Sequence, residues 1–515
     1  MPNKNPKAKK LQSGNSFPAS STIRECIFDS IENLSTGCKT QNKILPEGIE
    51  HLIIAGQQCI ESRELERAIH LFSRAINEAP NNNGAQAGLS WALGLRALAL
   101  VDEKKFENAI ADIRTAILHC PDAWELQYNL GNAHLKSDNY LAAVMAYQKV
   151  IELNFNSADV QCNLGVAFER LGYFTKALEC YQNAIALSSE NFSALYNMSL
   201  LLLKLGDYAN GFKLYESRWQ TKEFIHFKRN FNAPKWSGEP SLSSKTILLH
   251  SEQGFGDTIQ FLRFCLWFDS KDVEVLIQCP APLIEIARSM NIQAKFFAMD
   301  SKLPPYDFHC PLMSLPHALS HKTELKLRQS PYLESSRSEK AKWHDKFKES
   351  KQPRIGLILE GKNTHALNHF RNIDPTELID VMPRGIDYFL IQKELSEKSK
   401  KFLAKRSDVT DLSNLLIDFS DTAAVCSSMD LIISVDTAVA HLSGALGCPT
   451  ILLLHYQSDW RWGLNTRTTH WYPTMELLRV ERNHEWKSIY PNLAEKIQLI
   501  LKDKNYLKMR IINCR

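Results

Sequence analysis

One stretch of the chain combines residue types that could bind an anion or handle a proton. An apolar run over 246–249 predicts a buried strand, and a turn punctuated by Gly254 and Gly256 follows it. We expect Asp257 and Thr258 to open the next helix, because apolar residues then recur at helical spacing. Backbone N–H groups at such a helix start can hold an anion or position a carboxylate. Asp257 is therefore either a helix cap or a positioned carboxylate.

A second stretch, residues 430–449, has the same strand-to-helix form. Its apolar strand ends at Asp436 and Thr437, which can cap a short helix, and Gly447 then stops that helix. The helix amides, the Thr437 hydroxyl and His441 could bind a diphosphate at the C-terminal edge of a sheet. A carboxylate beside a diphosphate would be repelled, so we expect Asp436 to cap the helix and not to contact phosphate.

Other suggestive patterns have simpler explanations. His365 and His369 share one predicted helical face, but no third ligand is evident, so no metal site is expected. The turn at Gly254 and Gly256 lacks a third glycine at Ile259, which disfavours a nicotinamide-binding fingerprint. Four aromatic residues late in the chain could stack on a base, although packing of the last helix is the expected role: Trp460, Trp462, Trp471 and Tyr472.

The composition limits the class of protein that must position these residues. A chain of 515 residues should hold more than one domain. Its net charge of +4, from 61 basic and 57 acidic residues, argues against nucleic-acid binding and membrane adhesion. The 12 cysteines form no CxxC pair, and neither a secretory signal nor a membrane span is evident, so a cytoplasmic protein is expected. Residues 1–48 are predicted to be a disordered basic arm and a leading helix.

From residue 49 to 225 the sequence repeats with a period of 34 residues. Small side chains at fixed offsets are typical of tetratricopeptide repeats, in which two antiparallel helices cross closely. About five repeats fit, with a two-turn helix extension near 84–100 that accounts for a shift in phase. One series of equivalent positions is Ala109, Ala143, Ala177 and Gly211, and another is Ala116, Val150, Ala184 and Arg218.

Asn129, Asn163 and Asn197 occupy one equivalent position in three successive repeats. A side-chain amide can both donate to and accept from an extended peptide backbone, so a ladder of amides suits peptide binding. Tetratricopeptide arrays that the sequence resembles bind peptides on a concave face. Similar asparagine ladders line the superhelix of the O-linked N-acetylglucosamine transferases. The alternative is that asparagine is simply common at this position in ordinary repeats.

Residues 226–245 are rich in proline, glycine and serine and predict a linker. Beyond it, apolar runs alternate with helical stretches, which predicts parallel sheets in two halves, 246–335 and 353–515, separated by a charged segment. A cleft is expected between the halves. The predicted strands are 247–249, 273–278, 296–298, 355–359, 388–392 and 431–435.

Two motifs carry a resemblance to a known family. They are Glu-Gln-Gly-Phe-Gly-Asp at 252–257 and Ser-Val-Asp-Thr-Ala-Val-Ala-His at 434–441, about 180 residues apart. Together they resemble the heptosyltransferase-type (family 9) glycosyltransferases, and especially bacterial proteins that fuse this module behind tetratricopeptide repeats. The resemblance implies a tetratricopeptide α-superhelix followed by a GT-B-like pair of Rossmann-type parallel-sheet halves. It also implies inversion of configuration, no cofactor, no obligatory metal and a nucleoside-diphosphate sugar as co-substrate.

The resemblance assigns roles to individual residues. Asp257 would be the general base that takes a proton from the acceptor hydroxyl, on the face opposite the leaving diphosphate. Thr437 and His441, in the motif that includes Asp436, would hold the donor phosphates. Arg371 falls where the family places a cation that neutralises the leaving group.

The match is not complete. Lys362 is a weaker candidate for the cationic role, because the stretch 360–371 matches the family only loosely. Ala438 stands where the heptosyltransferases usually have glycine after the Asp-Thr pair. The acceptor side and the transferred sugar are therefore unassigned.

The sequence thus predicts a cytoplasmic inverting glycosyltransferase whose repeats recruit the acceptor, with a protein or peptide as the expected partner. One alternative is a tetratricopeptide scaffold whose transferase domain has degenerated. Another is a cell-surface polysaccharide enzyme whose repeats only mediate assembly. Nucleotide-sugar binding would separate the enzymes from the scaffold.

Overall fold

The computed structural model describes residues 47–502 except 270, 321–329, 348–351, 362–370, 379–380, 395, 404–405 and 483–484. Residues 1–46 of the predicted basic arm and leading helix (1–48) therefore lie outside the described residues. The chain divides into two compact units, one that runs through the helical repeats to Leu201 and one that begins at Leu202 and contains both sheets. Within the described ranges, no helix has the length and apolar character needed to cross a membrane.

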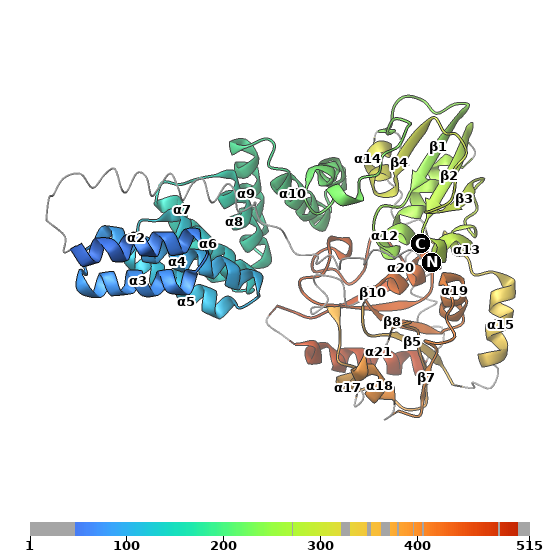
Figure 1. Cartoon of the computed structure of the whole chain (residues 1–515). Helices are drawn as coiled ribbons and strands as arrows, with labels where there is room; N and C mark the ends of the chain where they lie inside the picture. Colours follow the sequence, from blue (N-terminus) through green and yellow to red (C-terminus); the bar gives the residue numbers. More distant parts are fainter. Residues whose placement is uncertain are drawn as a thin grey trace, which may run out of the picture. The chain divides into compact units, whose positions relative to one another are not determined.

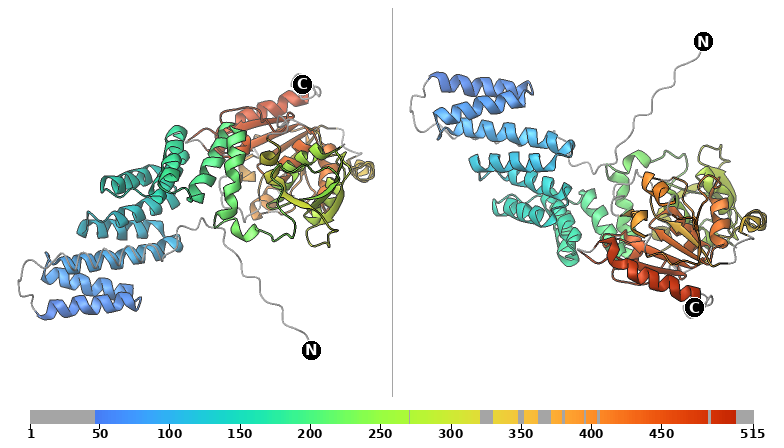
Figure 2. Two further views of the ribbon diagram at one scale, coloured as in Figure 1. Left: turned by 90° about the horizontal axis from the view of Figure 1, so that it is seen from above. Right: turned by 90° about the horizontal axis from the view of Figure 1, so that it is seen from below.

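The first unit is a stack of antiparallel helices, each packed on its neighbours in the chain (Figures 1 and 2). Apart from the longer α4, the helices are 13 to 15 residues long and are joined by tight turns, as the repeat period predicts. The fold therefore follows the predicted tetratricopeptide pattern. The helices are α2 (Glu47–Glu61), α3 (Leu65–Glu78), α4 (Asn83–Asp102), α5 (Phe106–His119), α6 (Trp124–Lys136), α7 (Tyr140–Glu152), α8 (Ala158–Arg170) and α9 (Phe174–Leu187). The next helix, α10 (Phe192–Leu205), begins in this unit and ends in the second.

Gly131 and Gly165, which are 34 residues apart in successive repeats, lie where the helices of a pair cross. A Cβ added to Gly131 would lie 2.5 Å from Tyr147 Cε1, and one added to Gly165 would lie 2.7 Å from Tyr181 Cε1. Contacts that short are impossible, so only glycine fits opposite these tyrosine rings. The predicted extension also has a structural counterpart, because α4 is 20 residues long and absorbs the shift in phase.

The second unit begins inside the last predicted repeat. Helix α11 (Tyr208–Tyr215) and the 3₁₀ helix η1 (Glu216–Gln220) belong with the sheets, apart from the last residue of η1, and not with the repeat stack. This corrects the expectation that the repeats continue to residue 225. The reason is local, since α11 is only eight residues long and its aromatic side chains pack against the sheet-containing unit.

The first sheet has four parallel strands in the order β3-β2-β1-β4. The sequence predicts three of them and misses β4, which is short and contains a histidine and a proline. Because β1 and β4 are adjacent but far apart in the chain, the strand order reverses between them. The elements are β1 (Lys245–His250), α12 (Phe255–Leu262), η3 (Arg263–Phe268), β2 (Val273–Cys279), η4 (Ala281–Leu283), α13 (Ile284–Ala287), β3 (Lys295–Ala298), β4 (Phe308–Pro311), η5 (Leu312–Ser314) and α14 (Leu315–Leu319).

The second sheet has six parallel strands in the order β10-β9-β8-β5-β6-β7. This is the doubly wound order of a dinucleotide-binding fold, with its reversal between β5 and β8. The predicted pair of Rossmann-type halves is therefore present, although β7, β9 and β10 were not predicted. The elements are α15 (Arg337–Phe347), β5 (Arg354–Ile358), α17 (Pro375–Leu378), β6 (Asp387–Leu390), α18 (Glu397–Leu403), β7 (Val409–Asp411), α19 (Phe419–Ser427), β8 (Leu431–Val435), α20 (Ala438–Ala445), β9 (Thr450–Leu454), η6 (Trp460–Trp462), β10 (Met475–Arg479), η7 (Trp486–Ile489) and α21 (Tyr490–Lys502).

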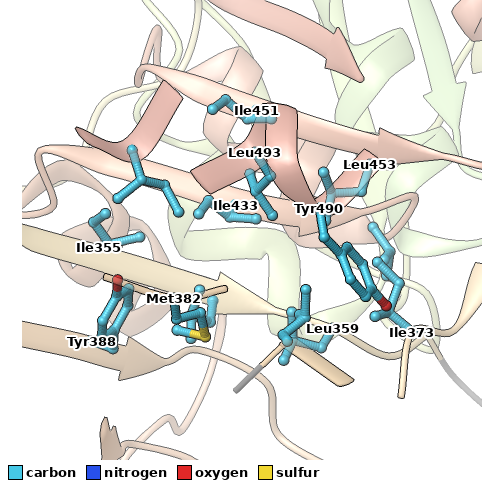
Figure 3. Packing of buried hydrophobic residues seen from close by; sticks show 14 of the residues in the cluster. Ile355, Leu359, Ile373, Met382, Tyr388, Ile433, Ile451, Leu453, Tyr490 and Leu493 are labelled. Carbon is cyan, nitrogen blue, oxygen red and sulfur yellow. The ribbon is translucent and has the colours of Figure 1, made fainter. Parts of the chain in front are cut away.

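Both faces of the second sheet are covered. On one face, Tyr490 and Leu493 of α21 pack on Ile433 and Leu453 of the central strands (Figure 3). On the other, α15 packs on α19, and Trp343 of α15 is fully buried. The charged segment that was predicted to separate the halves therefore includes a helix that is part of the second half. Burial on both faces explains why these strands are continuous apolar runs.

Candidate active site

The turn after β1 places Asp257 in the first turn of α12. Gly254 is the N-cap residue, so the helix begins at Phe255, two residues earlier than predicted. Oδ2 of Asp257 accepts a hydrogen bond of 3.0 Å from the Gly254 amide. The hydroxyl of Thr258 donates to the Gly254 carbonyl at 3.0 Å. Asp257 thus satisfies an orphan amide at the helix start, while 24% of its side chain stays exposed.

The turn after β8 is capped by Thr437 and not by Asp436, contrary to the sequence prediction. Thr437 has extended backbone angles, and its Oγ1 accepts from the Ala440 amide at 3.4 Å. Threonine at this position satisfies a first-turn amide of α20 and leaves the remaining amides of that turn directed outward. Because β8 borders the strand-order reversal, α20 starts at the edge where ligands bind in doubly wound sheets.

Helices α12 and α20, one from each half, pack directly against each other. A Cβ added to Gly256 would lie 2.9 Å from Cδ2 of His441 and 3.5 Å from Cα of Ala438. The glycine therefore permits close contact between the two motifs. The sequence predicted a cleft between the halves, whereas at this point the motifs touch.

Arg461 of η6 joins the two halves. Its Nη2 donates to Oδ1 of Asp257 at 2.5 Å, and its Nε donates to Oε1 of Gln260 at 2.6 Å. Nη1 donates to Asp459 at 2.8 Å. The side chain is 8% exposed, and nearby carboxylates outweigh the effect of burial and raise the pKa of Arg461. No sequence pattern predicts this role for Arg461, because its partner lies 204 positions earlier in the chain.

His441 has a different environment from the one expected of a phosphate ligand. It is 5% exposed, and its Nδ1 lies 2.9 Å from the Tyr472 hydroxyl. Its ring stacks on Trp462 at a centroid distance of 5.1 Å. Burial lowers the pKa of His441 well below its ordinary value, and Arg461 acts in the same direction. The ring is therefore neutral near pH 7 and supplies no positive charge to a phosphate.

Asp436 and Arg371 lie at the strand-order reversal of the second sheet. Burial raises the pKa of Asp436, and the positive charge of Arg371 opposes that increase. The Nε atom of Arg371 is buried and, within the described part of the chain, has no hydrogen-bond partner. A buried guanidinium nitrogen without a partner is an unsatisfied donor, which an acceptor such as a phosphate oxygen could satisfy.

Some candidates are not placed by the structure. Lys362, His365 and His369 lie outside the described residues. In the ranges that the structure does cover, no group of three or more His, Cys, Asp or Glu side chains could hold a metal ion.

The late aromatic residues do not pack on the last helix as expected: Trp460 and Trp471 pack on α11 and α12, whereas Trp462 and Tyr472 pack on His441 of α20. Trp471 contacts Phe212 of α11 and Phe261 of α12 at centroid distances of 6.5 and 6.3 Å. Trp460 contacts Phe212 at 5.8 Å. Trp471 is fully buried, so no base can stack on it in this structure. These rings instead fix the element that carries Arg461.

The asparagines of the predicted ladder connect neighbouring repeats. Nδ2 of Asn163 donates to the Tyr128 hydroxyl at 3.2 Å and to Asn132 at 3.1 Å. Nδ2 of Asn197 lies 3.6 Å from Cys162 Sγ, and Asn129 is only 5% exposed. Asn163 and Asn197 therefore have partners within the stack, and peptide binding by this ladder stays a prediction.

A pocket of about 850 Å³ lies on the first half, beside the C-terminal ends of β2 and β3. Arg229 at its wall donates to Oε1 of Gln278 at 2.8 Å. Next to it, Phe231 stacks over His309, and Nε2 of His250 lies 3.1 Å from Nδ1 of His309. Guanidinium, amide, carboxylate and hydroxyl groups all line the pocket, so it can both donate to and accept from a hydroxylated ligand. Its remaining lining residues include Asn232, Asp300, Ser301, Lys302 and Tyr306.

Family models match three parts of the chain. Two tetratricopeptide-repeat models cover residues 95–157 and 158–191. The model described as glycosyltransferase family 9 (heptosyltransferase) covers residues 313–487. The chain carries a family 9 glycosyltransferase domain and tetratricopeptide repeats. The matched part of the glycosyltransferase domain includes Thr437 and Arg461 but begins after the turn that holds Asp257, so the role of Asp257 rests on the shorter motif alone.

Known proteins resemble parts of the chain at low identity. Protein FlbA of Caulobacter vibrioides is 22% identical over 311 residues, which are 54% of this chain and 50% of FlbA. The chain thus spans about half the length of that relative. ADP-heptose LPS heptosyltransferase II of E. coli is 13% identical, and the superposition has a TM-score of 0.39. It covers 50% of this chain and 98% of the heptosyltransferase chain. MamA of Desulfovibrio magneticus is 16% identical, with a TM-score of 0.29. The superposition covers 34% of this chain and 98% of the MamA chain.

Proposed function

We propose that the glycosyltransferase domain transfers a sugar, with inversion, from a nucleoside-diphosphate donor to an acceptor that the repeats recruit. The observation that carries this proposal is the buried Nε of Arg371, which has no partner among the described residues and lies beside Asp436 at the reversal between β5 and β8. Ligands of doubly wound sheets bind at that edge. A diphosphate would supply the missing acceptor.

In this mechanism the donor phosphates lie at the N-terminus of α20. The outward amides and the Thr437 hydroxyl bind phosphate oxygens, and Arg371 neutralises the charge that develops on the leaving diphosphate. Helix amides and a guanidinium can supply this positive charge themselves, which supports transfer without an obligatory metal. His441 does not act as a cation here, because it is buried and neutral.

Asp257 acts as the general base. The Gly254 amide and Arg461 hold both of its oxygens in place, and a carboxylate has further lone pairs that can accept the proton of an acceptor hydroxyl. The partly exposed side chain is reachable from solvent. The pocket beside β2 and β3 lies on the same half as Asp257, which supports an acceptor site on this half. A protein or peptide bound by the repeats is the proposed acceptor.

Calorimetric titration with UDP-, GDP- and ADP-sugars tests the proposal. One of these donors should bind, and Arg371→Gln should weaken its binding. Repeating the titration with EDTA should leave the affinity unchanged, since no metal takes part. If no nucleotide sugar binds to the intact protein, the domain is a degenerate one and the chain is a tetratricopeptide scaffold.

A further inference from the structure

In the first sheet, the strand-order reversal between β1 and β4 is filled by a side chain of the protein itself. Arg218 of η1 is fully buried there. Its Nε donates to Oε1 of Glu252 at 3.1 Å, and its Nη2 donates to Oε2 of Glu252 at 3.0 Å and to the Ser314 hydroxyl at 2.8 Å. Glu252 follows β1, and Ser314 follows β4, so the guanidinium joins the two strand ends at the edge where such sheets usually bind ligands.

The same guanidinium is anchored to η1 and α11. Its Nη1 donates to the Tyr215 carbonyl at 3.1 Å and to Oε1 of Glu216 at 2.9 Å. Burial alone would lower the pKa of Arg218, but the charges of Glu252 and Glu216 outweigh it and raise the pKa. The cation is therefore fully paired, and it is a fixed part of the structure.

Glu252 is five residues before Asp257, in the turn that ends at the Gly254 cap. The next residue, Gln253, donates from Nε2 to the Tyr215 hydroxyl at 3.0 Å. Two successive residues of the turn are thus held by α11 and η1. Gly254, which follows them, donates its amide to Asp257. The chain of contacts runs without a break from Arg218 to the carboxylate of the proposed base.

The sequence contains a trace of this role. Arg218 occupies the position of a repeat at which Ala116 and Ala184 are fully buried small residues. A long charged side chain cannot fill a site made for alanine. Arg218 falls in the last predicted repeat, but it belongs to the sheet-containing unit and not to the repeat stack.

We propose that Arg218 is a positioning residue for sugar transfer: it fixes the turn from Glu252 to Asp257 and thereby the orientation of the Asp257 carboxylate. The inference rests on the proposed function for its catalytic consequence. The forked guanidinium is essential to it, because two parallel hydrogen bonds fix the Glu252 carboxylate in a way that a single ammonium cannot.

The first test separates positioning from folding. Replacing only Arg218 or only Glu252 would leave the other charge buried and unpaired. The informative variant therefore replaces both, R218M together with E252M, because methionine side chains keep the space filled. Hydrogen exchange of the amides at 251–258 should become about tenfold faster or more, the scale of losing hydrogen bonds to a charged group. The matched control is R406M with D408N, another ion pair of this unit, which should leave that exchange unchanged.

The second test uses turnover with the donor that binds to the wild-type protein. R218K keeps the positive charge but loses the two parallel hydrogen bonds of the guanidinium. We therefore expect kcat to fall at least tenfold, while the KM for the donor stays within about twofold of the wild-type value. Unchanged exchange in the double variant, or R218K with wild-type kcat, would overturn the proposal. Failure of every nucleotide sugar to bind to the wild-type protein would overturn the proposed function and leave the exchange result valid.

Discussion

Arg461 donates to Oδ1 of Asp257 at 2.5 Å, while the Gly254 amide donates to Oδ2 at 3.0 Å. The second half of the domain thus holds one oxygen of the carboxylate, and the first half holds the other. A carboxylate fixed at both oxygens is pre-oriented for proton transfer, and any loosening between the halves would change its orientation.

The pair of Asp257 and Arg461 gives the first prediction. Asp257→Asn keeps the side-chain size but removes the base, so transfer should fall by about 10²- to 10⁴-fold with little change in donor affinity. Turnover and calorimetry on the same preparation measure the two effects. Asp459→Asn, which removes a different partner of Arg461, is the control and should reduce turnover much less. Loss of donor binding in Asp257→Asn would show that the residue is only a helix cap.

Arg371 gives the second prediction. Arg371→Gln should weaken donor binding by about tenfold or more, because a charge-assisted hydrogen bond to phosphate is lost. Calorimetric titration measures the change. Arg384 is on the same half with 75% of its side chain exposed, so Arg384→Gln should bind donor like the wild type. Equal affinities in the two variants would place the diphosphate elsewhere.

The contact between α12 and α20 gives the third prediction. Gly256→Ala adds a methyl group 2.9 Å from His441 Cδ2, so the ring or the helix must move. Such overpacking should destabilise the domain by about 1–3 kcal/mol, seen as a lower unfolding temperature of the sheet-containing unit. Gly48→Ala, in α2 of the repeat unit, is a control for a glycine-to-alanine exchange in a helix, because its added methyl group meets open space and should leave that temperature unchanged. An unchanged unfolding temperature would mean that the two motifs do not depend on close contact.

The asparagine ladder gives the fourth prediction. The triple variant Asn129→Ala, Asn163→Ala and Asn197→Ala should slow transfer to a protein acceptor and leave transfer to a small sugar acceptor unchanged. Since Asn163 also links Tyr128 and Asn132, the stack should lose about 1 kcal/mol for that substitution. Asn183→Ala, at an exposed position of α9, controls for both effects. A parallel loss with both acceptors would indicate that the amides only stabilise the repeats.

The histidines beside the pocket give the fifth prediction. Burial lowers the pKa of His309 from 6.5 to about 4, and the charges of Lys235 and Arg229 act in the same direction. Between these pH values the unfolded chain binds a proton that the folded chain does not, so stability should fall as the pH drops from 6.5 to 4. His309→Asn should reduce this acid sensitivity, measured as unfolding temperature against pH. His344→Gln, at an exposed site, should not.

Much of the fold could be predicted because it is encoded in short patterns. The 34-residue repeat and the continuous apolar strands β1, β2, β5 and β8 depend on local periodicity, and each was predicted. Strand β4 was not predicted, because its four residues, which include His309 and Pro311, show no alternation of apolar and polar side chains. The prediction that Asp436 caps α20 was wrong, because cap geometry depends on backbone angles that the residue types alone do not determine.

The residues that organise the site were harder to predict. Arg461 and Asp257 are 204 positions apart, and Arg218 and Glu252 are 34 apart. Pairings at that distance depend on tertiary packing and leave no periodic signal in the sequence. The one local indication was an arginine at a repeat position made for a small residue. A residue that breaks a pattern at a position of close packing can therefore point to a partner elsewhere.

The place of Arg218 also limits how this chain could be recombined. A natural fusion or an engineered swap that joined a new repeat array at residues 226–245 would discard α11 and η1. Glu252, with 3% of its side chain exposed, would then be left without its guanidinium. The unit that must be exchanged as a whole, with the proposed sugar-transfer site, therefore starts before the linker, near Leu202. This start lies inside α10, a helix that the repeat pattern assigns to the repeats.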